Sequence, residues 1–161
     1  MAGKIQKITT FLWFDDNAEE AVNFYTSLFK NSKILQTVHY GKGMPGKAGT
    51  VMVIDFLLNE QKFSALNGGS VFKFNESISL VISCNDQKEI DYFWEKLCEG
   101  GSESQCGWLK DKFGLSWQIV PVNLNELIDD SDVARSQRVM GAVMKMIKLD
   151  IKTLEKAYNN K

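Results

Sequence analysis

Few side chains in this sequence could act as a nucleophile, a base or a metal ligand. The 161 residues contain one histidine, His39, and three cysteines, Cys84, Cys98 and Cys106, with no C-x-x-C pair among them. A single imidazole excludes a histidine-rich metal site. The odd number of cysteines favours a reducing, cytoplasmic setting over a disulfide framework.

Cys106 is the thiol whose neighbours in the sequence best suit chemistry. Lys110 and Lys112 follow it, and a neighbouring ammonium group lowers the pKa of a thiol. A nucleophilic cysteine usually also needs a base, and no histidine lies near this one in the sequence. The pattern therefore favours a buried, unreactive thiol, although Cys106 remains a candidate contact for a ligand.

Aromatic rings and amide groups offer a second kind of chemistry, the binding of a small molecule. Rings that point inward from neighbouring strands form a pocket suited to a flat or hydrophobic ligand, and a few polar groups orient it. The ligand-binding residues that we predict on this basis are Trp13, Phe72, Phe74, Gln105, Cys106, Trp108, Trp117 and Gln118. For Trp13 and Trp117 a second interpretation stays open, in which the rings fill a hydrophobic core.

Two charged segments have competing interpretations. Lys110–Gly114 either contributes Lys110 and Asp111 to the binding of a ligand or forms a plain charged turn that ends in glycine. Glu76 precedes an expected strand and is a candidate general base, although exposed glutamates are common at such positions. The plain turn and the solvated glutamate are the favoured interpretations.

An internal repeat indicates the elements that position these residues. The alignment that places the apolar run Phe11–Phe14 over Leu80–Ser83 also places Phe24 over Phe93. The residues around these matches keep the i, i+3, i+4, i+7 spacing of one apolar helix face. Each half therefore predicts a strand, a helix and three further strands.

The same pattern suggests where the helices begin and which strands follow them. Side chains of Asp15–Asn17 are expected to cap the first helix, and those of Asn85 and Asp86 the second. The strands expected after the helices are Ile34–Tyr40, Thr50–Leu58, Lys62–Asn67, Ser104–Leu109 and Leu115–Val120.

Helical patterns replace strand patterns from Asn123 onward. Leu124–Ile128 is short, Asp132–Ile147 is longer with its apolar residues on one face, and Asp150–Tyr158 is amphipathic. Residues 123–161 are therefore expected to form a helical extension of a domain that spans residues 1–122. The extension either closes over its own domain or packs on a second subunit.

Two β-α-β-β-β units in one chain resemble the vicinal oxygen chelate superfamily, which includes glyoxalase I, extradiol dioxygenases and bleomycin-resistance proteins. Phe14–Ala21 resembles the start of its PhnB-like branch, often labelled 3-demethylubiquinone 3-methyltransferase-like, and Gln105–Pro121 resembles the same branch. The resemblance runs from about Ile8 to Pro121. It implies an α+β fold in which two βαβββ halves form a barrel around a pocket.

The resemblance also implies a divalent metal, held in the superfamily's enzymes by His, Glu or Gln from the first, fourth, fifth and eighth strands. Those positions fall near Thr10, Ala65, Ser77 and Gln118. The four expected strands contain no His, Asp, Glu or Cys, and one neutral amide is a poor ligand set for a metal. We therefore expect no metal and no other cofactor.

Charge and hydropathy exclude several classes of partner. Lys and Arg number 19 against 20 Asp and Glu, and the net charge of −1 gives no basic surface for nucleic acid. The apolar runs are far shorter than the roughly 20 residues that cross a membrane.

The glycine-rich segment Gly41–Gly46 lies between two expected strands and contains a proline, so it does not predict the methyl-donor site of a methyltransferase.

These observations predict a cytoplasmic α+β protein that binds a small aromatic or hydrophobic molecule without a metal, and the resemblance adds a homodimer. Two alternatives stay open. One is an enzyme of the superfamily, or the methyltransferase of its label, with a relocated or metal-independent site. The other is a structural or regulatory dimer whose pocket is vestigial.

Overall fold

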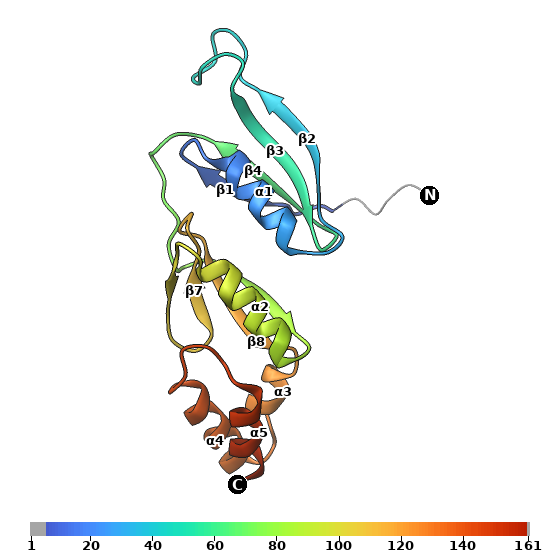
Figure 1. Cartoon of the computed structure of the whole chain (residues 1–161), viewed down its shortest axis with the longest axis vertical. Coiled ribbons are helices and arrows are strands. Elements are labelled where there is room, and N and C mark those ends of the chain that lie inside the picture. The colour runs from blue at the N-terminus through green and yellow to red at the C-terminus, as the bar shows by residue number, and fades with distance from the viewer. Residues whose placement is uncertain (1–5, 161) are drawn as a thin grey trace, which may run out of the picture. The chain divides into compact units, whose positions relative to one another are not determined.

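The computed structural model describes residues 6–160, and the chain divides into two compact units. Unit 1 ends at Lys73, and unit 2 begins at Phe74. Both units have the same order of elements, which is one strand, one helix and three further strands (Figure 1). Unit 2 then continues into three more helices.

Unit 1 is a four-stranded sheet with one helix on it. Its elements are β1 (Thr10–Phe14), α1 (Ala18–Leu28), β2 (Lys33–His39), β3 (Val51–Leu58) and β4 (Gln61–Asn67). The strands lie in the order β1-β4-β3-β2. β1 is parallel to β4, and the other neighbours are antiparallel.

The core of unit 1 lies between its sheet and α1. Leu12 and Phe14 of β1 and Phe63 of β4 are buried, whereas Phe11 is exposed. Tyr25 of α1 completes the same layer. Side chains alternate between the two faces of a strand, so every second residue points to the core and the residues between them point to the face opposite α1.

The cap of α1 differs from the expected one. Asn17 makes no side-chain hydrogen bond to the helix. Instead, Oδ1 of Asn67, at the end of β4, accepts a hydrogen bond from the backbone N–H of Ala18 at 2.8 Å. A distant asparagine thus satisfies the helix donor that a local cap would have satisfied, and it also ties α1 to the sheet.

Unit 2 repeats this arrangement. Its first five elements are β5 (Ser79–Cys84), α2 (Gln87–Cys98), β6 (Ser102–Glu103), β7 (Trp108–Lys110) and β8 (Ser116–Pro121). The strand order is β5-β8-β7-β6, with β5 parallel to β8. The separation of β5 from β1 along the chain equals that of α2 from α1, which confirms the internal repeat. The side chain of Asp86 caps α2, as expected.

One expected strand is wrong. The sequence predicts a continuous strand over Ser104–Leu109, whereas β6 ends at Glu103 and β7 begins at Trp108. Between them, Cys106 and Gly107 have φ angles of 60° and 81°. Two successive left-handed residues cannot continue an extended strand, so the chain reverses here in a tight turn.

The helices after β8 belong to unit 2 and pack on its sheet region. They are α3 (Leu124–Ile128), α4 (Val133–Val143) and α5 (Ile151–Asn159), and they gather at one end of the unit (Figure 1). Their buried core of Val139, Val143, Leu149 and Leu154 contacts Cys106 and Val120 of the sheet region. We call residues 123–160 the tail. No helix between residues 6 and 160 combines the length and hydropathy of a membrane span.

The longest expected helix of the tail ends early, at Val143 instead of Ile147. Its apolar residues also divide between two sides, because Val139 is buried whereas Met140 and Met144 are exposed. After the helix, the carbonyls of Met146 and Ile147 accept hydrogen bonds from the N–H groups of Cys106 and Gly107 at 2.8 and 2.7 Å. The turn between β6 and β7 thus binds the segment that the sequence pattern assigns to the helix.

Candidate functional site

The sheet of unit 2 has two different faces. Ile82, Trp117 and Ile119 are buried on the face that α2 covers. Their neighbours along the strands point to the other side, because side chains alternate. We call this other side the distal face of unit 2 and define it by Ser79, Val81, Trp108, Lys110, Ser116 and Gln118. It brings together two predicted ligand-binding residues, Trp108 and Gln118.

The strand register arranges the distal face of unit 2 in two rows. The polar row consists of Ser79, Ser116 and Lys110, in which Ser116 is the register partner of both others. The flat row consists of Val81, Gln118 and Trp108, in which Gln118 is the partner of both others. Nε2 of Gln118 donates to Oγ of Ser79 at 2.8 Å and so links the rows.

Lys110 carries the positive charge of the polar row. Its ammonium group pairs with the carboxylate of Glu76. The hydrogen bond from Lys110 holds the pKa of Glu76 below its usual value. A carboxylate with a lowered pKa is a weaker base, so this contact favours the solvated, ion-paired interpretation of Glu76 over a general base.

The side-chain hydroxyl of Ser116 is buried and lacks a hydrogen-bond partner among the described residues. The residue is 1% exposed, and its Oγ has no hydrogen-bond partner among residues 6–160. Leaving a buried hydroxyl unpaired costs about 1–3 kcal/mol. Since buried polar groups nearly always have partners, this hydroxyl calls for an explanation, and a bound ligand would supply one.

Trp117 lies on the other side of β8 from Gln118, because side chains alternate along a strand. It is 2% exposed, and its Nε1 donates to Oδ2 of Asp111 at 2.8 Å. Oδ1 of Asp111 accepts from the backbone N–H groups of Phe113 and Leu115 at 2.9 and 3.1 Å. This geometry favours a core role for Trp117 and the plain turn for Asp111.

Trp13 and Phe72 come together in unit 1. Their ring centroids are 5.0 Å apart, and the rings are nearly perpendicular. Nε1 of Trp13 donates to the carbonyl of Gly69 at 2.7 Å. The same ring lies against Gly68, where an added Cβ would come within 2.3 Å of it. Phe72 itself is mostly exposed, so this pair presents an apolar surface next to the end of β4.

Besides Trp117, three predicted ligand-binding residues lie outside both the distal face of unit 2 and the Trp13–Phe72 pair. Phe74 is half-buried in the segment before β5, and Gln105 is exposed in the turn between β6 and β7. Cys106, in the same turn, is half-buried, and its Sγ lies 3.7 Å from Sδ of Met144 in the tail. Their roles in binding stay predictions.

The other two thiols are poor nucleophiles. Burial raises the pKa of Cys84 to about 12 and the pKa of Cys98 to about 11. Both groups are therefore protonated at neutral pH, and the reactive form of a cysteine is the thiolate. Neither residue is a candidate for covalent chemistry.

Sequence reasoning missed a charged group on the face of unit 1 opposite α1. Asp55 of β3 accepts a hydrogen bond from Oγ of Ser64 at 2.6 Å and pairs with Nζ of Lys62 at 2.8 Å. Burial raises the pKa of Asp55, but the contacts with Lys62 and Ser64 outweigh this effect and the net pKa is lowered. A signal was present, because Asp55 is the one charged residue in the apolar run Val51–Leu58.

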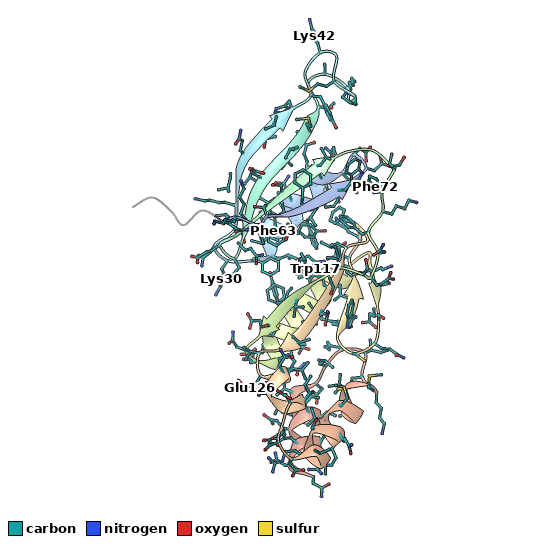
Figure 2. All side chains as sticks on the ribbon, turned by 180° about the vertical axis from the view of Figure 1, so that it is seen from behind. Lys30, Lys42, Phe63, Phe72, Trp117 and Glu126 are labelled. Atoms are coloured by element: carbon teal, nitrogen blue, oxygen red, sulfur yellow. The ribbon has the colours of Figure 1, made fainter. Side chains whose placement is uncertain are left out.

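Unit 1 also contains a cavity of about 500 Å³ beyond the ends of β1 and β4. Tyr40 and the loop after β2, whose tip carries Lys42 (Figure 2), form one side of it. Asp15, Asp16 and Glu19 at the start of α1 form another. Acidic side chains are common at helix N-termini, where they interact favourably with the positive end of the helix dipole. Their presence here therefore does not by itself indicate a ligand.

The side chains on β1, β4, β5 and β8, the strands that hold the metal in the superfamily's enzymes, do not fit a divalent metal. The expected positions Thr10 and Ala65 lie on the face of the sheet that α1 covers. The opposite face carries their neighbours along the strands, Phe11 and Ser64. The side-chain hydroxyls and amide facing away from the helices on these strands are then those of Ser64, Ser79, Ser83, Ser116 and Gln118. Divalent metals in proteins are held chiefly by carboxylate, imidazole or thiolate ligands, and hydroxyls with one neutral amide are a poor set. Across residues 6–160, no three His, Cys, Asp or Glu side chains cluster in a way that could hold one.

A family model for 3-demethylubiquinone-9 3-methyltransferases matches residues 6–120. The chain belongs to this family. The match includes both sheets and ends in β8, so the tail lies outside it. Membership confirms the resemblance to the PhnB-like branch that the sequence indicates. No curated protein matches the chain.

Solved structures confirm the fold. The family's PhnB protein from Bacillus cereus is 41% identical, with 71% of this chain and 99% of that chain covered and a TM-score of 0.66. A Pseudomonas aeruginosa protein is 18% identical over 73% of this chain and 98% of that one, with a TM-score of 0.60. The fosfomycin resistance protein FosX from Listeria monocytogenes is 15% identical over 78% and 97%, with a TM-score of 0.54. The α+β fold is that of glyoxalase and bleomycin-resistance proteins.

Proposed function

We propose that this protein binds a small, planar, largely apolar molecule on the distal face of unit 2, without the divalent metal of its superfamily. The flat row carries the proposal. Trp108 offers a half-buried ring, and Gln118 beside it offers an amide that can orient a ligand. An apolar surface with few polar groups is the usual make-up of a site for a small organic molecule.

The donor set supports binding without a metal. The distal face of unit 2 offers hydroxyls, an amide and one ammonium group, which suit an organic ligand better than a divalent ion. Methyl transfer does not fit this chain. The glycine-rich segment Gly41–Gly46 is a loop between β2 and β3, whereas methyl-donor sites of the dinucleotide-binding type lie between a strand and a helix.

The proposal also includes a homodimer in the cytoplasm. The tail exposes four apolar side chains that a second copy would cover, namely Val133, Met140, Met144 and Ile147. The three free cysteines suit a reducing compartment.

Native mass spectrometry of untagged protein, purified without a chelator, tests this function. It reports the mass of the assembly, any bound metal and any organic molecule retained from the cell. We expect a dimer that carries an organic adduct and no stoichiometric metal. In the Trp108→Leu variant the adduct should be lost, because the ring that holds it is removed.

The matched control is Tyr92→Leu, which removes another exposed ring from unit 2, on α2 instead of the distal face. This variant should retain the adduct. One divalent metal per subunit would contradict the proposal, and so would an adduct retained equally well by Trp108→Leu.

A further inference from the structure

The polar row of unit 2 has hydrogen-bond donors that its own contacts do not use up. Oγ of Ser79 accepts from Gln118, so its own O–H is directed elsewhere. The ammonium group of Lys110 has three N–H donors, and the pairing with Glu76 occupies one of them. Oγ of Ser116 lies between these two residues in the register and has no partner within residues 6–160.

The register places these donors close enough to share one group. Side chains directly opposite each other on antiparallel strands, as those of Lys110 and Ser116 are, have Cβ atoms about 4.5–5.5 Å apart. The parallel strands that carry Ser79 and Ser116 lie about 4.8 Å apart. A group of two oxygens held over Ser116 would therefore reach the hydroxyls of both serines and the ammonium group of Lys110. Such a ligand would also satisfy the buried hydroxyl, which the protein alone leaves unpaired.

The charges near the row indicate the sign of that group. Lys110 is the one cation of the distal face, and its present partner, Glu76, lies on an exposed segment before β5. An exposed ion pair is worth at most about 1 kcal/mol, so a ligand can replace Glu76 at little cost. The ammonium group of Lys110 already binds a carboxylate of the protein, so it can bind the carboxylate of a ligand in the same way.

We propose that the polar row is a carboxylate-binding subsite, so that the molecule bound by this protein is a planar carboxylic acid; this inference rests on the proposed function. The ring of the ligand lies on the flat row of Val81, Gln118 and Trp108. Its carboxylate accepts from Ser116, Ser79 and Lys110. A single lysine matches one negative charge, whereas phosphate groups are usually held by several cations or by arginine.

Isothermal titration calorimetry with 2-naphthoate and 2-naphthamide tests the subsite. The two probes have the same ring and similar shape but differ in charge. The protein should bind 2-naphthoate about tenfold more tightly, as expected for one charge-assisted hydrogen bond. Lys110→Met and Ser116→Ala should each reduce this preference and leave the affinity for 2-naphthamide nearly unchanged.

Lys112→Met is the matched control. Lys112 lies over the ring of Phe113, in the turn that follows β7, so its removal deletes a nearby charge without touching the row. This variant should keep the preference for 2-naphthoate. Ser116→Ala should also raise the melting temperature of the ligand-free protein by about 2–4 °C, because it removes a buried, unpaired hydroxyl.

The outcomes separate this inference from the proposed function. Equal affinity for the two probes, unchanged in Lys110→Met and Ser116→Ala, would refute the carboxylate subsite and leave the binding function intact. Failure of both probes to bind would count against the proposed function itself. A preference lost equally in Lys112→Met would assign the effect to general electrostatics and also overturn the subsite.

Discussion

Asp111 holds together the turn that leads from β7 into β8. It is 3% exposed, and its carboxylate accepts hydrogen bonds from Trp117 Nε1 and from the backbone N–H groups of Phe113 and Leu115. A buried carboxylate is tolerated only when its oxygens are paired in this way. The position of Trp117 in the core therefore depends on an acidic residue that, in the sequence, belongs to an ordinary charged turn.

Replacing Asp111 by alanine should lower the free energy of unfolding by about 3 kcal/mol, because two buried donors and one partly buried donor lose their acceptor at once. Urea denaturation followed by tryptophan fluorescence measures this change. Asp16→Ala removes an exposed aspartate and should change the stability by less than about 0.5 kcal/mol. Equal effects of the two substitutions would refute the structural role of Asp111.

The three cysteines should differ in their reaction with iodoacetamide. Burial raises the pKa of Cys84 to about 12 and of Cys98 to about 11, so almost no thiolate forms at either residue at pH 8. Cys106 is half-buried and should be modified first in the native protein. Peptide mass spectrometry identifies the modified residue, and unfolded protein serves as the control in which all three react. Modification of Cys98 as fast as Cys106 would show that α2 does not protect its thiol.

At the scale of elements, the turn between β6 and β7 is one attachment of the tail, and α2 is another. Gly107 has a φ angle of 81°, and a Cβ added there would lie 2.8 Å from the carbonyl oxygen of Ile119 and 3.1 Å from Cγ of Leu149. A side chain at this position would push the tail away from β8. Gly114 has a similar φ of 85°, but nothing lies within 4 Å of its added Cβ.

This pair of glycines separates backbone strain from packing. Gly114→Ala should cost about 1 kcal/mol from its backbone conformation alone. Gly107→Ala should cost about 3 kcal/mol, because the clash with the sheet and the tail is added to the same strain. Thermal unfolding measures both. If the two substitutions destabilise the protein equally, the tail is not packed against Gly107.

Acid should loosen the tail. The hydrogen bond from Lys148 holds the pKa of Asp91 below its ordinary value of 3.8, and the hydrogen bond from Thr153 does the same for Asp150. A pKa that is lower in the folded state adds stability above the unfolded value, and this stability is lost as the pH falls through the folded value. The loss therefore begins below a pH of about 3.8.

Methyl NMR signals of Leu149, recorded from pH 6 to pH 2, measure this loosening. In Asp91→Asn the step below pH 4 should shrink, because one of the titrating groups is gone. Asp16→Asn, which removes an exposed aspartate before α1, serves as control and should keep the step. A step of the same size in Asp91→Asn would show that the Asp91–Lys148 pair does not hold the tail.

The sequence predicted the elements whose signals are periodic and local. The internal repeat, the helix faces around Tyr25 and the strands β3 and β4 follow from such patterns. The cap of α1 by Asn67 was not predictable, because a side chain far along the chain supplies it. The turn at Cys106 was missed because a cysteine rarely adopts a left-handed conformation, and only the neighbouring Gly107 hinted at it.

The candidate site was predictable only in part, for a related reason. Trp108 and Gln118 are conspicuous as residue types, and the resemblance to a family directs attention to their segment. Ser79 and Ser116 are not conspicuous, since serine is common. Their placement opposite each other depends on the register between β5 and β8, which no local pattern specifies.

For the whole molecule, the two units combine one topology with different chemistry. Each sheet has its first strand parallel to its last and one helix on one face. On the face opposite α1, Asp55 is paired within the unit by Lys62 and Ser64. On the distal face of unit 2, the hydroxyl of Ser116 lacks such a partner among the described residues. This difference supports placing ligand binding on unit 2, beside the flat row of Val81, Gln118 and Trp108.

The most direct test of this placement is a ¹H–¹⁵N NMR titration of the protein with 2-naphthamide in the presence of EDTA. A neutral probe tests binding by the flat row independently of the carboxylate subsite, and the chelator removes divalent metals. We predict shifts of the indole N–H of Trp108 and of the side-chain amide of Gln118. The indole N–H of Trp94, which donates to Glu103 at 2.8 Å, should not move. No shift at Trp108, or a shift that appears only when a divalent metal is restored, would contradict metal-free binding on the distal face of unit 2.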